Sequence, residues 1–72
     1  MTNVELKREI LEALSGLIEH APDVRFGQLI ANLAVIARGP APEAVWDMED
    51  DELLLAVKGL IEDYERRHVG VV

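Results

Sequence analysis

The sequence predicts an all-α fold, a compact domain of three helices at about 4–20, 24–38 and 49–67. Apolar residues recur at the helical spacing of about 3.6 residues in each of these stretches. Segments that contain proline or glycine separate the stretches from one another. Half of the 72 residues are hydrophobic, which is enough to form a core. We therefore expect a single domain over residues 1–72, with a frayed tail at 69–72.

The first helix is predicted from an apolar face that continues for four turns. Either Thr2 or Asn3 is suited to cap its start, because both side chains accept a hydrogen bond from a backbone amide. Pro22 ends the helix, because the residue before a proline avoids the helical conformation. The residues expected to face the core are Leu6, Ile10, Ala13, Leu14 and Leu17, flanked by Leu11 and Ile18.

The second and third helices follow from the same kind of pattern. Asp23 is the expected N-cap of the second helix, and Gly39 followed by Pro40 ends it. The third helix begins near an acidic run and ends before Gly70. The residues expected to face the core are Phe26, Leu29, Ile30, Leu33, Ile36 and Ala37 in the second helix, and Leu53, Val57, Leu60, Ile61 and Tyr64 in the third.

Two short segments, 24–26 and 44–46, favour β structure and come directly before helices. They allow a two-residue bridge between them, which would be too small to count as a sheet. The bridge is an optional addition to the three predicted helices.

Composition excludes several classes of function. The net charge of -7 repels phosphate groups, so we expect no direct binding to nucleic acid or to an anionic membrane. No apolar run reaches the length of about 20 residues that a membrane span needs. No leader segment with a charged and then an apolar part opens the sequence, and we expect a cytoplasmic protein. The absence of cysteine excludes disulfides and thiolate metal sites.

Catalytic residues are scarce in this sequence. Ser15 lies inside the first predicted helix, and His20, five residues later, falls on a different side of that helix. No phosphate-binding glycine loop, zinc-protease motif or serine–histidine–aspartate set is present. We therefore expect no enzyme activity, no cofactor and no structural metal.

An acidic run places five carboxylates within the six residues from Asp47 to Glu52. Acidic residues in a first helical turn satisfy free amides and the positive end of the helix dipole, so capping is the favoured interpretation. Asp47 and Glu49 compete as the N-cap, and Glu49 is preferred because it places Glu52 at the third helical position. The alternatives are a surface that binds a partner, using Asp47, Asp50 and Asp51, or a weak divalent-cation site.

Trp46 is the only tryptophan and comes just before this run. The favoured interpretation makes its side chain a lid over the ends of the helices. The alternative is an exposed anchor for a partner, because tryptophan is enriched at the centres of protein interfaces.

A polar stripe is expected on the second helix, where Arg25, Gln28 and Asn32 share one face. In the structural interpretation, Arg25 holds a carboxylate of the acidic run, while Gln28 and Asn32 hydrogen-bond the proline-rich connector at 39–42. A ligand-binding stripe and a plainly solvated face are the alternatives. Val35 and Leu55 are apolar residues on otherwise polar faces, and in so small a domain they favour a homodimer.

These features resemble a set of small bacterial and phage proteins that have no established activity. The resemblance is carried by the segment Arg25–Ile30 with Asn32, followed by an aromatic residue and by Glu49–Leu53, and it covers about residues 23–62. It implies a shared helical domain and transfers no site.

The sequence as a whole predicts a non-enzymatic acidic interaction module that self-associates and binds a protein partner. Two other functions are weighed against it: a regulator that mimics nucleic acid and occupies a basic binding site, and a weak cation-binding protein.

Overall fold

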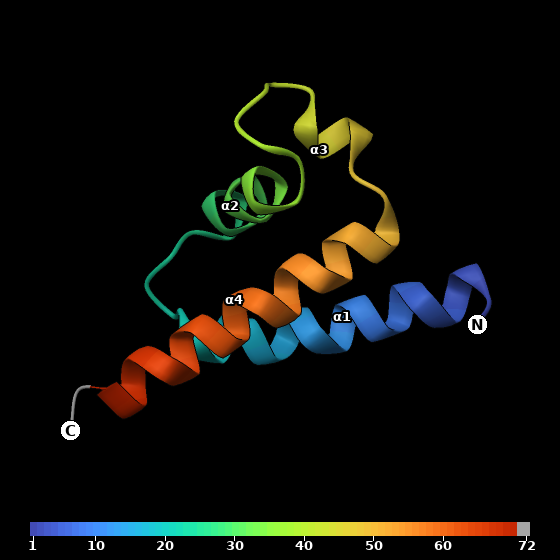
Figure 1. Ribbon diagram of the computed structural model, residues 1–72. Helices are drawn as coiled ribbons and strands as arrows, with labels where there is room; N and C mark the ends of the chain where they lie inside the picture. Colours follow the sequence, from blue (N-terminus) through green and yellow to red (C-terminus); the bar gives the residue numbers. More distant parts are fainter. Residues whose placement is uncertain (71–72) are drawn as a thin grey trace.

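The computed structural model describes the backbone of residues 1–70 and the side chains of residues 1–67. The described residues form four helices, α1 (Asn3–His20), α2 (Phe26–Arg38), α3 (Ala44–Asp47) and α4 (Asp50–Gly70), and contain no strand. Figure 1 shows α1 and α4 side by side and running in the same direction, with α2 across α4 and the short α3 beside α2. The predicted all-α class is confirmed, but there is one helix more than predicted.

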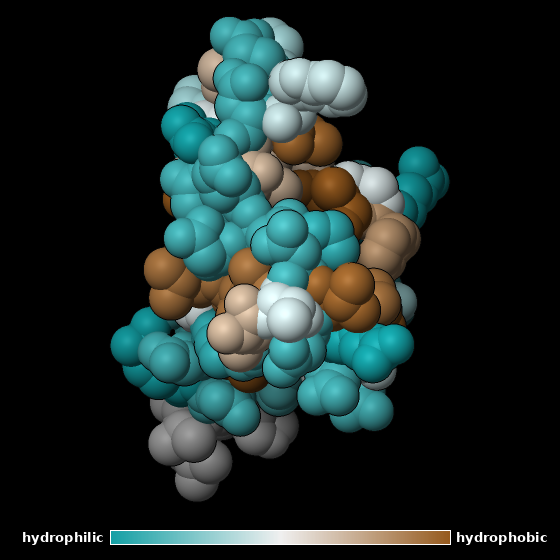
Figure 2. Space-filling view, turned by 90° about the vertical axis from the view of Figure 1, so that its right-hand side faces the viewer, coloured by the Kyte–Doolittle hydropathy of each residue, from teal (hydrophilic) through white to brown (hydrophobic). Residues whose placement is uncertain are grey.

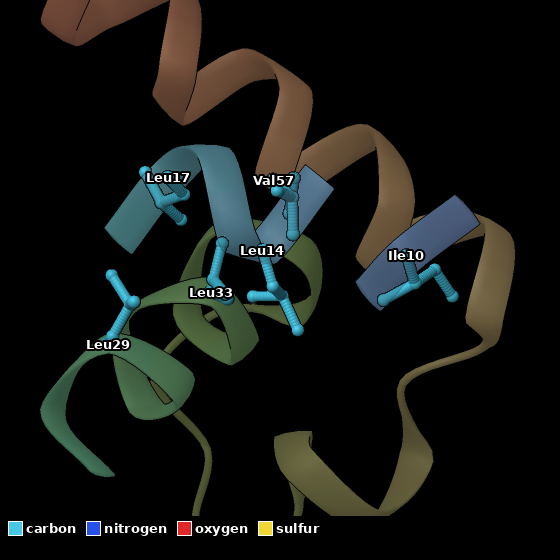
Figure 3. Close-up of a cluster of buried hydrophobic side chains, with 7 residues drawn as sticks. Ile10, Leu14, Leu17, Leu29, Leu33 and Val57 are labelled. Atoms are coloured by element: carbon cyan, nitrogen blue, oxygen red, sulfur yellow. The ribbon is translucent and has the colours of Figure 1, made fainter. Parts of the chain in front are cut away.

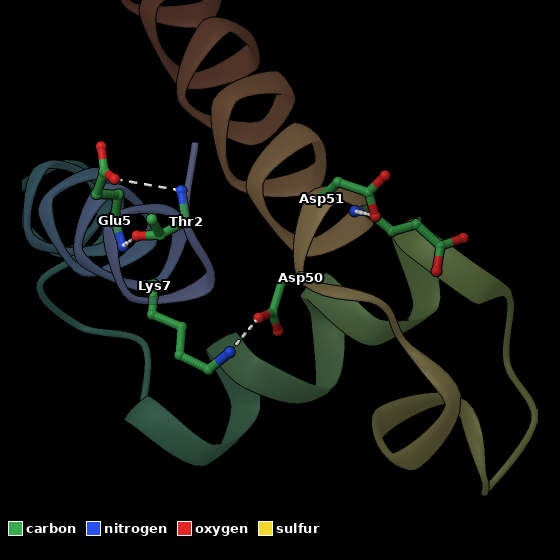
Figure 4. Close-up of polar contacts among 6 residues, drawn as sticks. Thr2, Glu5, Lys7, Asp50 and Asp51 are labelled. Atoms are coloured by element: carbon green, nitrogen blue, oxygen red, sulfur yellow. Dashed lines mark hydrogen bonds and ion pairs between the residues drawn. The ribbon is translucent and has the colours of Figure 1, made fainter.

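A capping box at the N-terminus fixes the start of α1. The hydroxyl of Thr2 accepts a hydrogen bond from the Glu5 amide at 3.1 Å, and the Glu5 carboxylate accepts one from the Thr2 amide at 3.2 Å (Figure 4). The two bonds satisfy amides that no helical carbonyl reaches. Thr2, one of the two predicted caps, is therefore the residue that fills this role. The helix ends at His20, directly before the Ala21–Pro22 step.

The start of α2 corrects one prediction. Asp23 is not its N-cap, because Pro22 and Asp23 lie in a turn that the Val24 amide closes on the Ala21 carbonyl at 3.2 Å. The helix begins later, at Phe26, and its cap residue is Arg25. The side-chain oxygen of Gln28 accepts a hydrogen bond from the Arg25 amide at 3.2 Å, which is the returning half of a capping box.

The bridge allowed between segments 24–26 and 44–46 does not form. Residues 44–47 instead make the single helical turn α3, in which the Asp47 amide donates to the Glu43 carbonyl and the Met48 amide to the Ala44 carbonyl, both at 3.0 Å. These local bonds use the backbone groups that a bridge would need. The physical reason is proximity along the chain: a turn closes over four residues, whereas a bridge must join distant segments.

Helix α4 starts as the preferred register predicts. The Glu52 carboxylate accepts a hydrogen bond from the Glu49 amide at 2.8 Å, and the Leu53 amide donates to the Glu49 carbonyl at 3.0 Å. Glu49 is thus the N-cap. The helix continues past the predicted end at residue 67 to Gly70, so the first part of the expected frayed tail at 69–72 is helical, and residues 71–72 lie outside the described residues.

The core lies where α1, α2 and α4 meet (Figure 3). Periodicity identified most of it correctly, because Leu14, Leu17, Leu29, Leu33 and Val57 are all buried. Its buried residues are Ile10, Leu14 and Leu17 from α1, Leu29 and Leu33 from α2, and Ala56 and Val57 from α4. The partly buried residues that pack on it include Leu6, Ala13, Ile30, Ala37, Leu53, Leu60, Ile61 and Tyr64.

Two predicted core residues of α2 are exposed instead. Phe26 has 56% and Ile36 has 53% of its surface accessible. The backbone of α2 lies closer to α4 and to the short α3 than to α1, so the buried stripe of α2 is narrow. Ala34, which the pattern did not single out, is buried in their place. Within the described residues, no helix combines the length and apolar character required to cross a membrane.

Candidate functional site

The carboxylates of the acidic run at the start of α4 contact two neighbouring helices and the backbone of α4 itself. The Lys7 ammonium of α1 lies 2.6 Å from an Asp50 oxygen, and the Arg38 guanidinium of α2 lies 3.0 Å from a Glu52 oxygen. Asp51 accepts a hydrogen bond from the Glu52 amide at 2.9 Å. Figure 4 shows Asp50 turned toward Lys7, while Asp51 points to another side of the helix. The run therefore caps α4 and ties it to both neighbouring helices.

This arrangement corrects the predicted partner of the run. Among the described residues, the ion pairs of the acidic run use Lys7 and Arg38, and Arg25 takes part in none of the four ion pairs. Arg25 stands at the beginning of α2, whereas Arg38 stands at its end. The interpretation that Arg25 bridges to the run is wrong because the register of α2 against α4 brings the opposite end of α2 to Glu52.

No candidate metal site is formed by this run. Within the part of the chain that the structure describes, no three histidine, aspartate or glutamate side chains lie together in a way that could hold an ion. Asp47 is on α3, and the carboxylates of α4 fan out around the helix axis, because consecutive helical residues are about 100° apart.

The pKa of the Glu52 carboxyl is lowered from its ordinary value of 4.5. The hydrogen bond from the Glu49 amide is the main cause, and the Arg38 charge acts in the same direction, while partial burial acts against both. A carboxyl whose pKa is lower in the folded state stabilises the fold above its unfolded pKa. That contribution is lost as the pH falls through the folded value.

We expect Glu52→Gln to lower the urea midpoint at pH 7 and to do so less and less as the pH is reduced to about 3. Glutamine still accepts a hydrogen bond from the Glu49 amide, so the variant removes the charge and leaves the cap. Glu65→Gln is the control, because Glu65 makes no hydrogen bond or ion pair within residues 1–67, and it should change the midpoint little. A Glu52→Gln effect that is constant across this pH range would contradict the assignment.

Trp46 is the most exposed large hydrophobic side chain of the described residues, with 90% of its surface accessible. The prediction that it covers the core is wrong. Helix α3 packs on α2 through Ala44, which is 4% exposed, and a helix of four residues buries only one side. Val45 and Trp46 are therefore turned to solvent, with the exposed Asp47 next to them. Of the two interpretations of Trp46, the one that leaves its side chain exposed matches the geometry.

The polar stripe of α2 is fully exposed. Arg25, Gln28 and Asn32 all face solvent, and within the described residues neither Gln28 nor Asn32 bonds the proline-rich connector. Gln28 is occupied at the start of its own helix. Asn32 lies at the rim of a hollow between α2 and α4, away from Trp46 and the acidic run. The predicted site residues are therefore not gathered at one place.

Sequence reasoning missed a groove between α2 and α4. It consists of two hollows of about 260 and 360 Å³ that share Ile36. Tyr64 lines the larger hollow, and its ring is stacked on His20 with 6.2 Å between the ring centroids, while the Arg67 guanidinium lies 5.1 Å from the Tyr64 centroid. In the sequence, the signal of this groove was that Val35 and Leu55 are apolar residues on otherwise polar helix faces. Only the packing of α2 on α4 places these two exposed residues at one groove.

Apolar side chains also reach the surface elsewhere. Figure 2 shows them in separate groups between hydrophilic ones, on the side of the molecule that faces right in Figure 1. A third hollow, of about 410 Å³, lies between α1 and the start of α4, where Lys7 meets Asp50. Comparison with known proteins finds no matching family model, no matching curated protein and no matching solved structure.

Proposed function

We propose that this chain is a non-enzymatic acidic interaction module that binds a protein partner through α3 and also associates with itself. The observation that carries the proposal is the exposure of Trp46, 90% of which is accessible to solvent. Leaving a large aromatic side chain in water forgoes the free energy of its burial, and tryptophan is among the side chains most enriched at the centres of interfaces. Val45 beside it adds exposed apolar surface.

The charge around Trp46 indicates the chemistry of the partner. Asp47 and Glu43 flank it in the chain, both are exposed, and neither forms an ion pair with a described residue. Asp50 and Glu52, in contrast, are already paired with Lys7 and Arg38. A partner that carries lysine or arginine next to apolar side chains complements this surface, and the net charge of -7 steers such a partner toward the module.

The other residues predicted to bind a partner have different surroundings. Asp51 stays available because it has no cationic partner within the described residues. Arg25, Gln28 and Asn32 are exposed on α2, but they belong to a different surface from Trp46. A cytoplasmic location is part of the proposal, and fractionation of the host cell tests it.

We expect Trp46→Ala to weaken binding by tenfold or more in a peptide-binding experiment. Random 12-residue peptides selected for binding to the immobilised protein should be enriched in lysine or arginine beside leucine or aromatic residues. Because Trp46 is the only tryptophan, its fluorescence should move to shorter wavelength when a selected peptide covers it. Without peptide, its emission should match that of an indole in water.

Two controls accompany this experiment. Asp47→Asn should reduce the salt dependence of peptide binding while leaving the fluorescence change intact, because it removes charge and keeps the tryptophan. Phe26→Ala removes an aromatic side chain that is also exposed but lies on α2, and it should bind peptides like the unchanged protein. Selected peptides that bind Trp46→Ala as tightly as the unchanged chain would rule out the α3 surface.

The two other functions gain no support from an observation. A nucleic-acid mimic requires a long row of free carboxylates, and here Lys7 and Arg38 neutralise two of the clustered acids. A cation-binding role lacks a group of ligands within residues 1–67.

A further inference from the structure

We propose that a second copy of this chain packs antiparallel against α4, with the two helices crossing at Gly59. The inference rests on the self-association included in the proposed function and assigns it a surface. That surface consists of the outer face of α4 around Leu55 and Gly59, together with the groove toward α2 that Val35 and Ile36 line. It is separate from the α3 surface that carries Trp46.

A single copy of the chain leaves a large surface exposed. Its accessible area is 5352 Å², whereas a folded monomer of 8.0 kDa is expected to expose about 4,450 Å². The excess of about 900 Å² is close to the roughly 800 Å² that each partner buries in an interface of standard size. The radius of gyration of 12.6 Å also exceeds the value of about 11 Å expected for 72 residues. One copy is therefore less compact than a monomer of its mass usually is.

Gly59 lies in the interior of α4, at an exposed position. Glycine in a helix interior is less favourable than alanine and needs a reason. A Cβ atom at Gly59 would meet nothing within 4 Å, so no packing inside this chain requires the glycine. Gly16 differs, because its Cβ would touch Ile61 of α4 at 4.0 Å. An exposed glycine on a helix lets the backbone of another helix approach closely, and this accounts for Gly59 where the fold of one copy does not.

The proposed surface is complementary to itself. Leu55, 71% exposed, precedes Gly59 by one helical turn and shares its face. Across the groove stand the exposed side chains of Val35 and Ile36. The surface therefore carries both a protruding leucine and, farther along α4, the hollow lined by Val35, Ile36 and Leu60, which can receive the leucine of the other copy. A two-fold axis requires this combination, because each copy must supply both halves of the contact.

The distribution of charge along α4 sets the direction of the two helices. The helix starts with Asp50, Asp51 and Glu52 and has Arg66 and Arg67 near its other end. Asp51 and Arg67 lie equally far from Gly59 in the sequence, and so do Glu52 and Arg66. An antiparallel crossing at Gly59 therefore places acid against base at both ends, whereas a parallel crossing places like charges together. Among residues 1–67, Asp51 pairs with no cationic side chain and Arg67 with no carboxylate.

The outer face of α1 is the competing surface, and its charges make it the weaker candidate. It carries an exposed apolar stripe at heptad spacing, formed by Val4, Leu11 and Ile18. Each of these is followed by a glutamate, at positions 5, 12 and 19. A second copy on this stripe would add three more glutamates beside these, and a contact that gathers like charges is unfavourable. The α1 stripe therefore serves as a control.

Sedimentation equilibrium of the full chain at about 0.15 M salt, where the repulsion between acidic copies is screened, tests the proposal. We expect the unchanged protein to approach twice the mass of 8.0 kDa as its concentration rises. Leu55→Glu should raise the dimer dissociation constant at least about tenfold, which corresponds to about 1.4 kcal/mol. Leu11→Glu changes an equally exposed leucine on α1 and should leave the constant unchanged. A monomeric unchanged protein, or a loss of dimer with Leu11→Glu alone, overturns the proposal.

Gly59→Ala distinguishes an effect on the dimer interface from an effect on the stability of the fold. Alanine favours the helix and meets no atom in the single chain, so the thermal midpoint of dilute monomer should rise. The added methyl group holds the two helices apart, so the dimer dissociation constant should increase severalfold. A variant that dimerises as tightly as the unchanged protein overturns the crossing at Gly59.

A pair of charge reversals tests the direction of the helices. Asp51→Arg and Arg67→Asp should each weaken the dimer, and the double variant should restore it to within about threefold of the unchanged protein, because the pair of charges is exchanged. Absence of rescue contradicts the antiparallel register. Trp46→Ala should leave dimerisation intact, and Leu55→Glu should leave peptide binding intact, so a failure of the dimer and a failure of partner binding are distinguishable.

Discussion

Leu17→Ala is expected to destabilise the fold by about 2–5 kcal/mol. Leu17 has 0% of its surface exposed and lies in the core that α1 forms with α2 and α4, as Figure 3 shows. The substitution removes buried methyl groups and leaves a cavity that the helices fill only partly. A core in a domain of this size rarely supplies more than about 3–5 kcal/mol. A large fraction of the variant should therefore be unfolded at 25 °C.

Urea unfolding followed by circular dichroism measures this effect. Leu11→Ala is the matched control, because it makes the same substitution in the same helix at a side chain that is 65% exposed. Its free energy of unfolding should stay within about 0.5 kcal/mol of the unchanged protein. Equal losses at both positions would mean that α1 does not present this face to the core.

Gly39→Ala is expected to cost about 1–3 kcal/mol for a different reason. Gly39 has φ 89° and ψ -178°, a backbone conformation that is open to glycine and strained for residues with a Cβ atom. A Cβ at this position would meet nothing within 4 Å, so the cost arises from the backbone alone. The Gly39 amide also donates to the Val35 carbonyl at 2.7 Å, which ends α2 and turns the chain toward α3.

A thermal melt with Gly27→Ala as control isolates this backbone effect. Gly27 lies in the first turn of α2, and its Cβ would likewise meet nothing within 4 Å. Because its backbone is helical, alanine should leave the melting temperature unchanged or raise it slightly. Gly39→Ala should lower it by several degrees. A Gly39→Ala protein that melts with the unchanged chain would show that the turn tolerates another conformation.

The helices and most of the core were predictable because their signals are local. The spacing of Leu14 and Leu17 shows which side of α1 is buried, whatever packs against it. The caps at Thr2 and Glu49 were predictable for the same reason, since a capping box closes over three residues. The failures at Asp23 and at segment 44–46 are local as well. There several weak signals competed, and short hydrogen bonds along the chain decided between them.

The ion pairs and the exposure of Trp46 depended on the arrangement of whole helices. Lys7 reaches Asp50 because α1 and α4 run side by side, and Arg38 reaches Glu52 because the end of α2 meets the start of α4. The positions of Arg25 and Arg38 in the sequence do not show which of them lies closer to Glu52. Trp46 is a residue type common in cores, and it is exposed because the short α3 turns Ala44, and not Trp46, to the interior.

The sequence by itself determined the all-α class, the approximate positions of the three long helices, the buried stripe of each and the capping role of the acidic run. Periodicity and capping act over a few residues, so they can be recognised before the chain folds. Only the tertiary structure decided which charges pair, that Trp46 faces solvent, and that Ile36 and Leu55 border one groove beside an unexplained Gly59. These features depend on the register between helices far apart in sequence, which side-chain packing sets.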